Sequence, residues 1–517
     1  MTDMDKAAAR LAAAVRNQET VGVFGDYDVD GACSGALMAL MLRELGCTVL
    51  SHVPDRMTEG YGPNAPALAG LVHRGASLVV CVDCGTAAAD ILASVEADVI
   101  VLDHHAAQGD IPRVIATVNP NRPDCQSGLR MLCAAGVAFM TAVATHRVLR
   151  REGFFASRPE PDLKQLLDLV ALATVCDVMP LVGLNRAFVT AGLKVLGRRG
   201  RPGLAALLDV ARITEIPTAM SLGWALGPRI NAAGRISEAD LGLRLLLAED
   251  EVSARGLAAT LDSVNRTRQT VEADMLEDAM AQAKAQVEAG RATLVVAGPQ
   301  WHAGVVGIVA GRIKEKFNRP ACVAALADGL AKGSGRSVPG IDLGAAIIAA
   351  RAHGLLISGG GHAMAAGFGL HTKDLEAFHT FLDERLAAAA LLPAAADLRV
   401  EGSIAVEGCT LELAQQIHRL APFGPGNEEP LVVLPRVRVA RAERIGAEGN
   451  TLRAFLEGEG GGRLKSVMFR AGETPLAQVL LARDGGLLHI AGHLRAETWN
   501  GRVSVGFMIV DAAPVHS

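Results

Sequence analysis

Residues 20–180 alternate short apolar runs with longer Ala- and Leu-rich stretches. The apolar runs that predict buried strands are 21–25, 48–54, 78–83, 98–105 and 114–120. The intervening segments, such as 34–46 and 86–96, have the pattern of helices. Alternation of this kind predicts βαβ units, and therefore a parallel sheet with helices on both faces.

The pattern changes twice further along the chain. Residues 250–290 form one charged, amphipathic stretch that predicts a long helix between two domains. A second α/β unit occupies 292–388, and the Ala/Pro-rich stretch 386–397 separates it from a region of short strands and turns. About five short strands in this last region predict a small β-barrel.

The chain has 517 residues, which exceeds the size of one hydrophobic core. We therefore expect an α/β protein with a parallel-sheet domain, a linking helix, a smaller α/β domain and a C-terminal barrel. The expected boundaries are 1–245 for the first domain with its connecting segment, 246–290 for the helix, 291–390 for the second domain and 398–517 for the barrel.

Composition narrows the class of protein. With 50% hydrophobic and 20% charged residues, the chain is globular and not disordered. The formal net charge of −5 argues mildly against a nucleic-acid binder, although net charge averages over domains. The apolar stretch 131–145 is shorter than the roughly 20 residues of a membrane span and predicts a buried helix.

The expected location is the cytoplasm. The first ten residues contain acids where a secretory signal needs a cationic start and an apolar run. The nine cysteines are scattered and odd in number, which is most simply explained by reduced thiols. Cys81 and Cys84 have CxxC spacing, but no second pair accompanies them, and a structural role is favoured over zinc or redox chemistry.

Acidic residues gather where the predicted strands end. In chain order the candidates are Asp26, Asp28 and Asp30, then Asp83, then Asp103 with His104 and His105, and finally Asp177. Carboxyl ends of parallel strands converge on one crevice, so these segments are expected to meet. Any one of the aspartates taken alone is better explained as a helix N-cap. The four features together favour a common site.

Clustered carboxylates repel one another, and their pKa values rise unless cations lie between them. Several carboxylates with one or two imidazoles can hold two divalent ions, and this mixture suits Mn²⁺ or Mg²⁺ better than zinc. Two such ions form a clamp for phosphoryl transfer, which activates water and stabilises the attacking and leaving oxygens. The acidic cluster therefore predicts a metal-dependent phosphoesterase.

These residues resemble the motifs of the DHH phosphoesterase superfamily: "GDYDVDG", "VCVDCGT", "LDHH" and "ATVCDVMPL". In the second half, "GSGRS" and "GGGHAMAAGF" resemble the companion domain DHHA1. The segments 224–236 and 301–320 are similar to those of RecJ-type proteins, a family of single-strand-specific 5′→3′ DNA exonucleases. The predicted C-terminal barrel matches the position of the OB-fold in that family.

The resemblance implies roles for individual residues. The implied metal ligands are Asp28, Asp30, Asp83, His104 and Asp177, with Asp83 bridging two ions and Asp26 either a ligand or a supporting acid. The implied catalytic residues are Asp83, His105 as a phosphate-contacting partner, and Asp103, which would orient an imidazole. Which histidine of the triplet binds metal stays open at this point.

The resemblance also implies substrate-binding residues. "GSGRS" is interpreted as a glycine-loosened turn that presents Arg336, which can grip phosphate bidentately, and Ser337. Gly360 and Gly361 allow backbone N–H groups to approach an anion, with His362 beside them; a flexible loop is the alternative. In the connecting segment, Arg229, Asn231 and Arg235 are expected to line the path of the strand, with an interdomain turn as the alternative.

The resemblance thus implies an exodeoxyribonuclease, a hydrolase that degrades single-stranded DNA from the 5′ end with two Mn²⁺ or Mg²⁺ ions, in DNA repair and recombination. The resemblance implies a monomer without membrane association, assisted by single-strand-binding protein and a helicase. One alternative is a DHH phosphodiesterase that acts on oligonucleotides or cyclic dinucleotides, although such proteins lack the extra domain. Another is a non-catalytic replication scaffold resembling Cdc45, whose metal site is degenerate.

Overall fold

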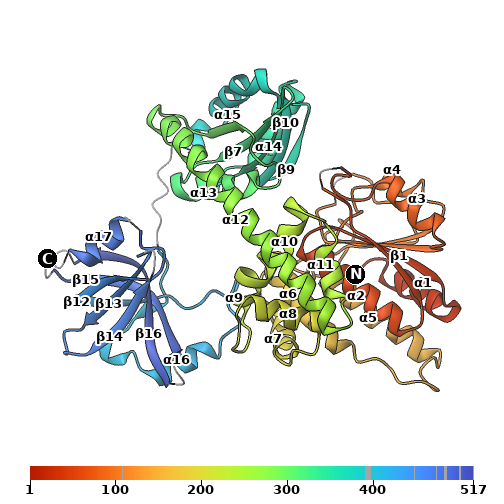
Figure 1. Ribbon diagram of the computed structural model, residues 1–517, viewed down its shortest axis with the longest axis horizontal. Coiled ribbons are helices and arrows are strands. Elements are labelled where there is room, and N and C mark those ends of the chain that lie inside the picture. The colour runs from red at the N-terminus through yellow and green to blue at the C-terminus, as the bar shows by residue number, and fades with distance from the viewer. Residues whose placement is uncertain are drawn as a thin grey trace. The chain divides into compact units, whose positions relative to one another are not determined.

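The computed structural model describes residues 1–56, 58–107, 109–390, 398–446, 449–472, 474–482, 486–499 and 502–515. These residues form two compact units (Figure 1). The larger unit comprises Met1–Asp177 and the chain from Ala191 to the end of the second α/β domain. The smaller unit comprises Val178–Thr190 and the C-terminal barrel.

The first domain is built on a five-stranded sheet in the order β2-β1-β3-β4-β5, and all its pairings are parallel. The strands are β1 (Thr20–Gly25), β2 (Thr48–His52), β3 (Leu78–Val82), β4 (Asp98–Leu102) and β5 (Ala116–Val118). The predicted parallel sheet is therefore confirmed. Its helices include α1 (Met4–Asn17), α2 (Val29–Glu44), α3 (Ala65–His73), α4 (Ala89–Leu92) and α5 (Ala134–Arg151).

Helices cover both faces of this sheet, as the buried strands require. Phe24, Val79 and Cys81 belong to a core cluster with residues of α3 and α4 on one face. Val23, of the opposite parity on β1, lies against α2 on the other face. The helix expected over 86–96 is shorter than predicted, because only the single turn of α4 is helical there.

Further helices follow the sheet along the chain, all in the larger unit except the first half of α7, which belongs to the smaller one. They are η1 (Leu163–Leu166), α6 (Leu167–Cys176), α7 (Gly183–Gly197), α8 (Pro202–Val210), α9 (Ala219–Ser221), the π-helical η2 (Leu222–Leu226), α10 (Gly227–Ile236) and α11 (Leu241–Leu246). The segment 224–236 is thus helical, and the alternative of an interdomain turn is wrong. A π-helical turn of this kind is rare and occurs mostly at functional sites.

The long helix predicted between the domains is α12 (Glu251–Glu288), which begins at an N-cap, Asp250, that accepts two backbone N–H groups. Its first half buries small and apolar residues such as Ala258 and Leu261. In its second half, Met275 and Ala279 enter the core cluster of the next domain. The helix therefore packs against both domains along one buried face, while its other positions stay charged and exposed.

The second domain has a mixed five-stranded sheet in the order β6-β7-β8-β10-β9, in which only the β6–β7 pairing is parallel. Its elements are β6 (Leu294–Pro299), α13 (Val306–Phe317), β7 (Ala321–Ala327), β8 (Leu330–Arg336), α14 (Leu343–Ala352), β9 (Ser358–His362), β10 (Ala365–His371), η3 (Thr372–Asp374) and α15 (Leu375–Ala390). The "GSGRS" segment is therefore mostly strand, and its interpretation as a turn was wrong.

The smaller unit contains a closed five-stranded barrel, in which β12, β13, β14, β16 and β15 pair in turn and β12–β15 closes the circle. The elements are β11 (Gly402–Ser403), η4 (Val406–Gly408), α16 (Leu411–His418), β12 (Val432–Ile445), β13 (Thr451–Glu457), β14 (Arg463–Met468), α17 (Pro475–Leu481), β15 (Leu488–Trp499) and β16 (Arg502–Pro514). The predicted C-terminal barrel is confirmed, and closure removes exposed strand edges.

Within the described ranges, no helix combines the length and the apolar character that crossing a membrane requires.

Candidate metal centre

The parallel sheet brings three acidic segments to one edge. Asp26 directly follows β1, Asp83 follows β3 and Asp103 follows β4. Asp177 was predicted at the end of a fourth strand, but the residue is the C-cap of helix α6, so this part of the prediction was wrong. The run before it is buried on all sides, and burial hides the helical period that would have distinguished helix from strand.

The turn between β1 and α2 is tightly built. Asp28 is the N-cap of α2, and its Oδ1 accepts a hydrogen bond from the Gly31 N–H at 3.0 Å. Position 31 has no room for a side chain, because a Cβ there would lie 2.4 Å from the Asp26 carbonyl oxygen. The glycine therefore lets the first turn of α2 close over Asp26.

Asp30, in the first turn of α2, also anchors a second helix. Its Oδ2 accepts from the Ala134 N–H at 2.7 Å and its Oδ1 from the Ala135 N–H at 2.8 Å, at the start of α5. Both Asp28 and Asp30 thus cap helices, which is the alternative role that the sequence predicted for a single aspartate. Capping does not compete with metal binding here, because Asp28 Oδ1 and Asp30 Oδ2 each accept one of these hydrogen bonds and keep a further lone pair.

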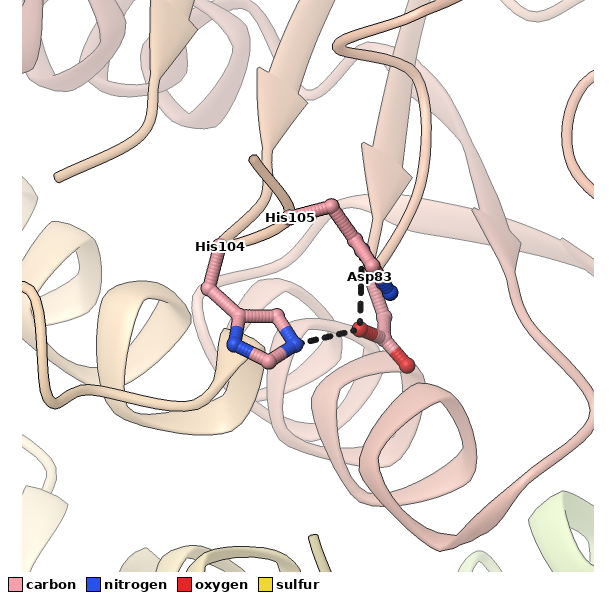
Figure 2. A group of neighbouring side chains, drawn as sticks. All are labelled: Asp83, His104 and His105. Carbon is pink, nitrogen blue, oxygen red and sulfur yellow. Dashed lines mark ion pairs between the residues drawn. The ribbon is translucent and has the colours of Figure 1, made fainter. Parts of the chain in front are cut away.

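Asp83 occupies the middle of the cluster. It is 2% exposed, and its Oδ1 has no hydrogen-bond partner among the described residues. This oxygen lies 3.4 Å from His104 Nε2 and 3.9 Å from His105 Nδ1 (Figure 2). The backbone of Asp83 has a φ of 58°, a left-handed conformation that non-glycine residues seldom adopt. Such strain is characteristic of functional sites.

His104 faces three carboxylates through one ring nitrogen. In addition to Asp83, its Nε2 lies 3.6 Å from Asp30 Oδ2 and 3.6 Å from Asp177 Oδ2. These four residues come from β3, β4, α2 and α6, which are far apart in sequence. Their convergence is the arrangement that the crevice at the carboxyl ends of a parallel sheet makes possible.

His105 has a different environment from its neighbour. Its Nδ1 lies 2.8 Å from Asp103 Oδ1, which also accepts the backbone N–H groups of both histidines, while Asp103 Oδ2 accepts from the Thr86 N–H. Burial alone would lower the pKa of His105, but the hydrogen bond and charge of Asp103 outweigh burial and raise it to about 9. Burial opposes ionisation of Asp103, yet these hydrogen bonds and the charge of His105 hold its pKa well below its usual value.

The other buried carboxylates have the opposite behaviour. Burial, reinforced by neighbouring carboxylates, raises the pKa of Asp26 and of Asp177 to about 8 each. Burial and like charges also raise the pKa of Asp30 and Asp83. The cluster therefore cannot hold its full negative charge unless cations compensate it.

The donor atoms fit divalent cations. Three groups of ligand atoms each lie within 4.8 Å of one another: Asp83–His104–His105, Asp30–His104–Asp177 and Asp26–Asp28–Asp83. One carboxylate oxygen in each of Asp26, Asp83 and Asp177 is buried without a hydrogen-bond partner in the described part of the chain. Because the groups share Asp83 and His104, the set suits two neighbouring ions, and its oxygen-rich chemistry suits Mn²⁺ or Mg²⁺.

Sequence reasoning missed the aromatic side of the cluster. The chain has two tyrosines in 517 residues, and both lie at this site. The Tyr61 hydroxyl is 3.2 Å from His105 Nε2, and its ring contacts Tyr27 edge-on. The Arg56 guanidinium lies 5.5 Å from the centre of the Tyr27 ring. The rarity of tyrosine, combined with one tyrosine inside the first acidic motif, was the available signal.

Three arginines form a positive group in the same unit. Burial lowers the pKa of Arg235 to about 10, with contributions from Arg56 and Arg336. Burial and the charge of Arg56 also lower the pKa of Arg336. No described carboxylate forms an ion pair with any of the three. Guanidinium groups without a carboxylate partner can bind an anion, which would relieve their mutual repulsion.

The predicted substrate residues of the second domain divide into two kinds. Arg336 and His362 both pair with Ala365, from opposite sides of β10, so they lie in one row on one face of the sheet. His362 is exposed. Ser337 is 1% exposed, and its hydroxyl donates to the Ile341 carbonyl oxygen at 2.8 Å, away from solvent.

The glycine-rich segment is an ordered hairpin strand and not a flexible loop. Gly360 and Gly361 both lie in β9. Gly361 has a φ of 150°, and a Cβ there would lie 2.4 Å from the Ala365 carbonyl oxygen, so this position requires glycine. At Gly360 a Cβ would meet no atom within 4 Å, so its backbone is open to approach.

The predicted residues of α10 have partners within the protein. Arg229 Nε donates to Asp262 Oδ1 of α12 at 2.9 Å. Asn231 Oδ1 accepts the Val29 N–H at 3.1 Å. Only Arg235, whose Nη1 donates to the Gly304 carbonyl oxygen at 3.2 Å, also belongs to the positive group. The predicted role of these three residues along the path of the strand stays a prediction.

The CxxC pair has no sign of metal or redox chemistry. Cys81 and Cys84 are free and buried, and the Cys84 thiol donates to the Val82 carbonyl oxygen. Burial raises the pKa of the Cys81 thiol to about 12, and burial also raises that of Cys84. Both thiols therefore stay protonated, which favours the structural interpretation.

Three protein-family models match this chain, one for each of its domains. The DHH family, N-terminal domain, matches residues 20–174, the DHHA1 domain matches 290–388, and the RecJ OB domain matches 400–511. Among solved structures, RecJ from Thermus thermophilus in complex with Mn²⁺ superposes with a TM-score of 0.82 at 29% identity, covering 100% of this chain and 72% of that one. The exonuclease RecJ bound to manganese gives 0.63 at 34% identity, over 75% of this chain and 95% of that one.

Curated relatives agree with these structures. The single-stranded-DNA-specific exonuclease RecJ of Dickeya dadantii is 39% identical over 88% of this chain and 81% of its own length. That of Bacillus subtilis is 35% identical over 99% of this chain, which spans 64% of the relative's length. With three matching domain models, an intact set of acidic motifs and relatives of this similarity, the chain belongs to the RecJ family.

Proposed function

We propose that the protein is a single-stranded-DNA-specific exonuclease that hydrolyses phosphodiester bonds from the 5′ end with two divalent cations. The observation that carries the proposal is the set of overlapping ligand groups around Asp83 and His104, in a chain of the RecJ family. Solved structures of relatives are described as complexes with Mn²⁺ and with Mg²⁺.

The residues that would hold the ions are Asp26, Asp28, Asp30, Asp83, His104 and Asp177. His104 is assigned as the ligand of the histidine pair, because its Nε2 faces three carboxylates whereas Nδ1 of His105 is bonded to Asp103. When bound, two divalent ions supply an activated water and stabilise charge on the attacking and leaving oxygens.

His105 and Asp103 form a separate functional pair. With a pKa of about 9, His105 carries a proton and a positive charge near neutral pH. Its Nδ1 is bonded to Asp103, which keeps the ring in one orientation, so Nε2 is the atom that would donate to a phosphate oxygen of the scissile group, in exchange for its contact with the Tyr61 hydroxyl. The Tyr61 hydroxyl contacts the same ring from the other side and restricts it further.

The positive group formed by Arg56, Arg235 and Arg336 is proposed to bind the terminal phosphate of the strand. His362, in the same sheet row as Arg336, and the open backbone of Gly360 extend this surface. A site that requires a chain end would explain removal of nucleotides from the end in place of internal cleavage. The DHHA1 domain, residues 291–390, is therefore assigned to substrate binding. The other proposed divisions of this part of the chain are the first domain, 1–245, and the linking helix, 246–290.

The barrel, residues 398–517, is proposed to bind the single strand as well. Its arginines are less available than their spacing on β12 indicates, because Arg436 pairs with Glu459 and Arg441 with Glu443. We therefore expect a moderate contribution to affinity. Action as a monomer in the cytoplasm, assistance from single-strand-binding protein and a helicase, and roles in repair and recombination belong to the same proposal.

A single experiment tests the activity. The purified chain is incubated with Mn²⁺ and either a long 5′-labelled single strand, a 3′-labelled single strand, a blunt duplex or a dinucleotide. We expect early release of the 5′ label from single strands, progressive shortening of the 3′-labelled strand and an intact duplex. Hydrolysis of the dinucleotide alone would identify an oligonucleotide phosphodiesterase, and strand binding without hydrolysis would identify a scaffold.

A further inference from the structure

Helix α10 contacts the metal-centre turn through a side chain that the proposed chemistry does not use. The Asn231 Oδ1 accepts a hydrogen bond from the Val29 N–H at 3.1 Å, although the two residues are 202 positions apart. Val29 lies between Asp28 and Asp30, two of the proposed metal ligands. One turn later on α10, a Cβ at Gly234 would lie 2.9 Å from the Tyr27 carbonyl oxygen, so the helix and the turn are in close contact.

The bonded N–H group is one that its own helix cannot satisfy. Val29 is the first residue of α2, and the first N–H groups of a helix have no partner within it. The cap residue Asp28 uses its side chain for the Gly31 N–H. Val29 is 1% exposed, so water is excluded as a substitute and loss of Asn231 would leave a buried donor without a partner.

Helix α10 is itself fixed in place, which makes Asn231 a firm point of attachment. Arg229, two residues earlier, pairs with Asp262 of α12 at 2.9 Å, and both side chains are largely buried. Arg235, one turn later, donates to the Gly304 carbonyl oxygen of the second domain. The asparagine therefore lies between two anchors, and a shift of its amide would require α10 to move.

We propose that Asn231 is a positioning residue for the metal centre and not a contact for the DNA strand. By accepting the Val29 N–H, it holds the turn that carries Asp28 and Asp30 in the position required for metal binding. This assignment replaces the strand-binding role that the sequence predicted for Asn231. It rests on the proposed function, because it requires that the cluster bind divalent ions.

The test measures Mn²⁺ binding to the full chain, without DNA, by isothermal titration calorimetry. Asn231→Leu keeps the number and branching of the side-chain heavy atoms but removes the acceptor, and we expect Mn²⁺ affinity to fall by about 5- to 100-fold, the cost range of an unsatisfied buried N–H. Asn231→Asp keeps an acceptor oxygen in the same place, and its Mn²⁺ affinity should be no more than about threefold below that of the native chain.

The second readout is the affinity for a 5′-phosphorylated oligonucleotide in EDTA, measured by fluorescence anisotropy. For Asn231→Leu this affinity should stay within about twofold of that of the native chain. The control is Asp250→Ala, which removes a helix cap on α12 of comparable worth and should not change Mn²⁺ affinity. If circular dichroism shows that Asn231→Leu does not fold, Asn231→Ser takes its place, since its shorter side chain cannot reach Val29 directly.

Unchanged Mn²⁺ affinity in Asn231→Leu would overturn the inference, and weakened DNA binding in the same variant would restore the strand-contact role. These outcomes are distinct from failure of the proposed function. If the native chain binds no Mn²⁺, the metal-centre assignment fails before the variants are compared.

Discussion

Replacement of Asp83 by asparagine should separate metal binding from folding. Asparagine has nearly the same shape and tolerates the left-handed backbone at this position. At a separation of about 4 Å and an effective dielectric of about 20, two unit charges interact by about 4 kcal/mol. For a divalent ion, loss of the Asp83 charge therefore removes about 8 kcal/mol of attraction. Loss of the same charge also relieves repulsion with the neighbouring acids, which restores about half of that energy.

The net effect is about 4 kcal/mol, which corresponds to roughly a thousandfold loss of Mn²⁺ affinity. Hydrolysis of single-stranded DNA should fall by at least the same factor, while strand binding in EDTA survives. Without metal the variant should be more stable than the native chain at alkaline pH, because a buried carboxylate with a raised pKa has been removed.

The assay is thermal unfolding of both proteins at about pH 8.5, in EDTA and in Mn²⁺. We expect the variant to melt higher in EDTA but to gain little on addition of Mn²⁺, whereas the native chain gains substantially. Asp124→Asn, an exposed aspartate of the same domain, is the matched control and should gain as the native chain does. Full hydrolysis by Asp83→Asn, or an undiminished Mn²⁺-induced gain, would refute the two-metal assignment.

Three further outcomes follow from the structure. Because the pKa values of Asp26 and Asp177 are raised to about 8, the folded metal-free chain binds more protons than the unfolded chain between about pH 4 and pH 8. The stability of the metal-free chain should therefore fall as pH rises through this window. Mn²⁺ binding at pH 7 should release protons, which calorimetry in buffers of different ionisation enthalpy measures. Arg336→Ala should raise KM for a 5′-phosphorylated strand by about tenfold or more, whereas Ser337→Ala should leave KM within about twofold, since its hydroxyl is turned inward; equal effects would contradict this division. Deletion of 398–517 should weaken binding of a long strand more than it slows hydrolysis of a short, saturating oligonucleotide, and an unchanged affinity would remove the strand-binding role from the barrel.

The sequence by itself determined the parallel sheet, the long helix and the barrel, because each depends on a local pattern. Period-two and continuous apolar runs specify strands, and an amphipathic stretch of nearly forty residues can only be a helix. It also predicted that the acids after β1, β3 and β4 lie together, since strand ends of one parallel sheet converge. The error at Asp177 arose where burial on all sides removed the periodic signal.

Tertiary structure decided what each side chain faces. The sequence could not tell which histidine faces the carboxylate cluster, because adjacent residues carry equal chemistry. The fold turns His104 toward three carboxylates and His105 toward Asp103. Ser337 and Arg229 have the residue types of a binding surface, yet packing commits both to partners inside the protein. Contacts between residues more than 200 positions apart, such as Asn231 with Val29, depend on how whole elements pack, and no local pattern encodes them.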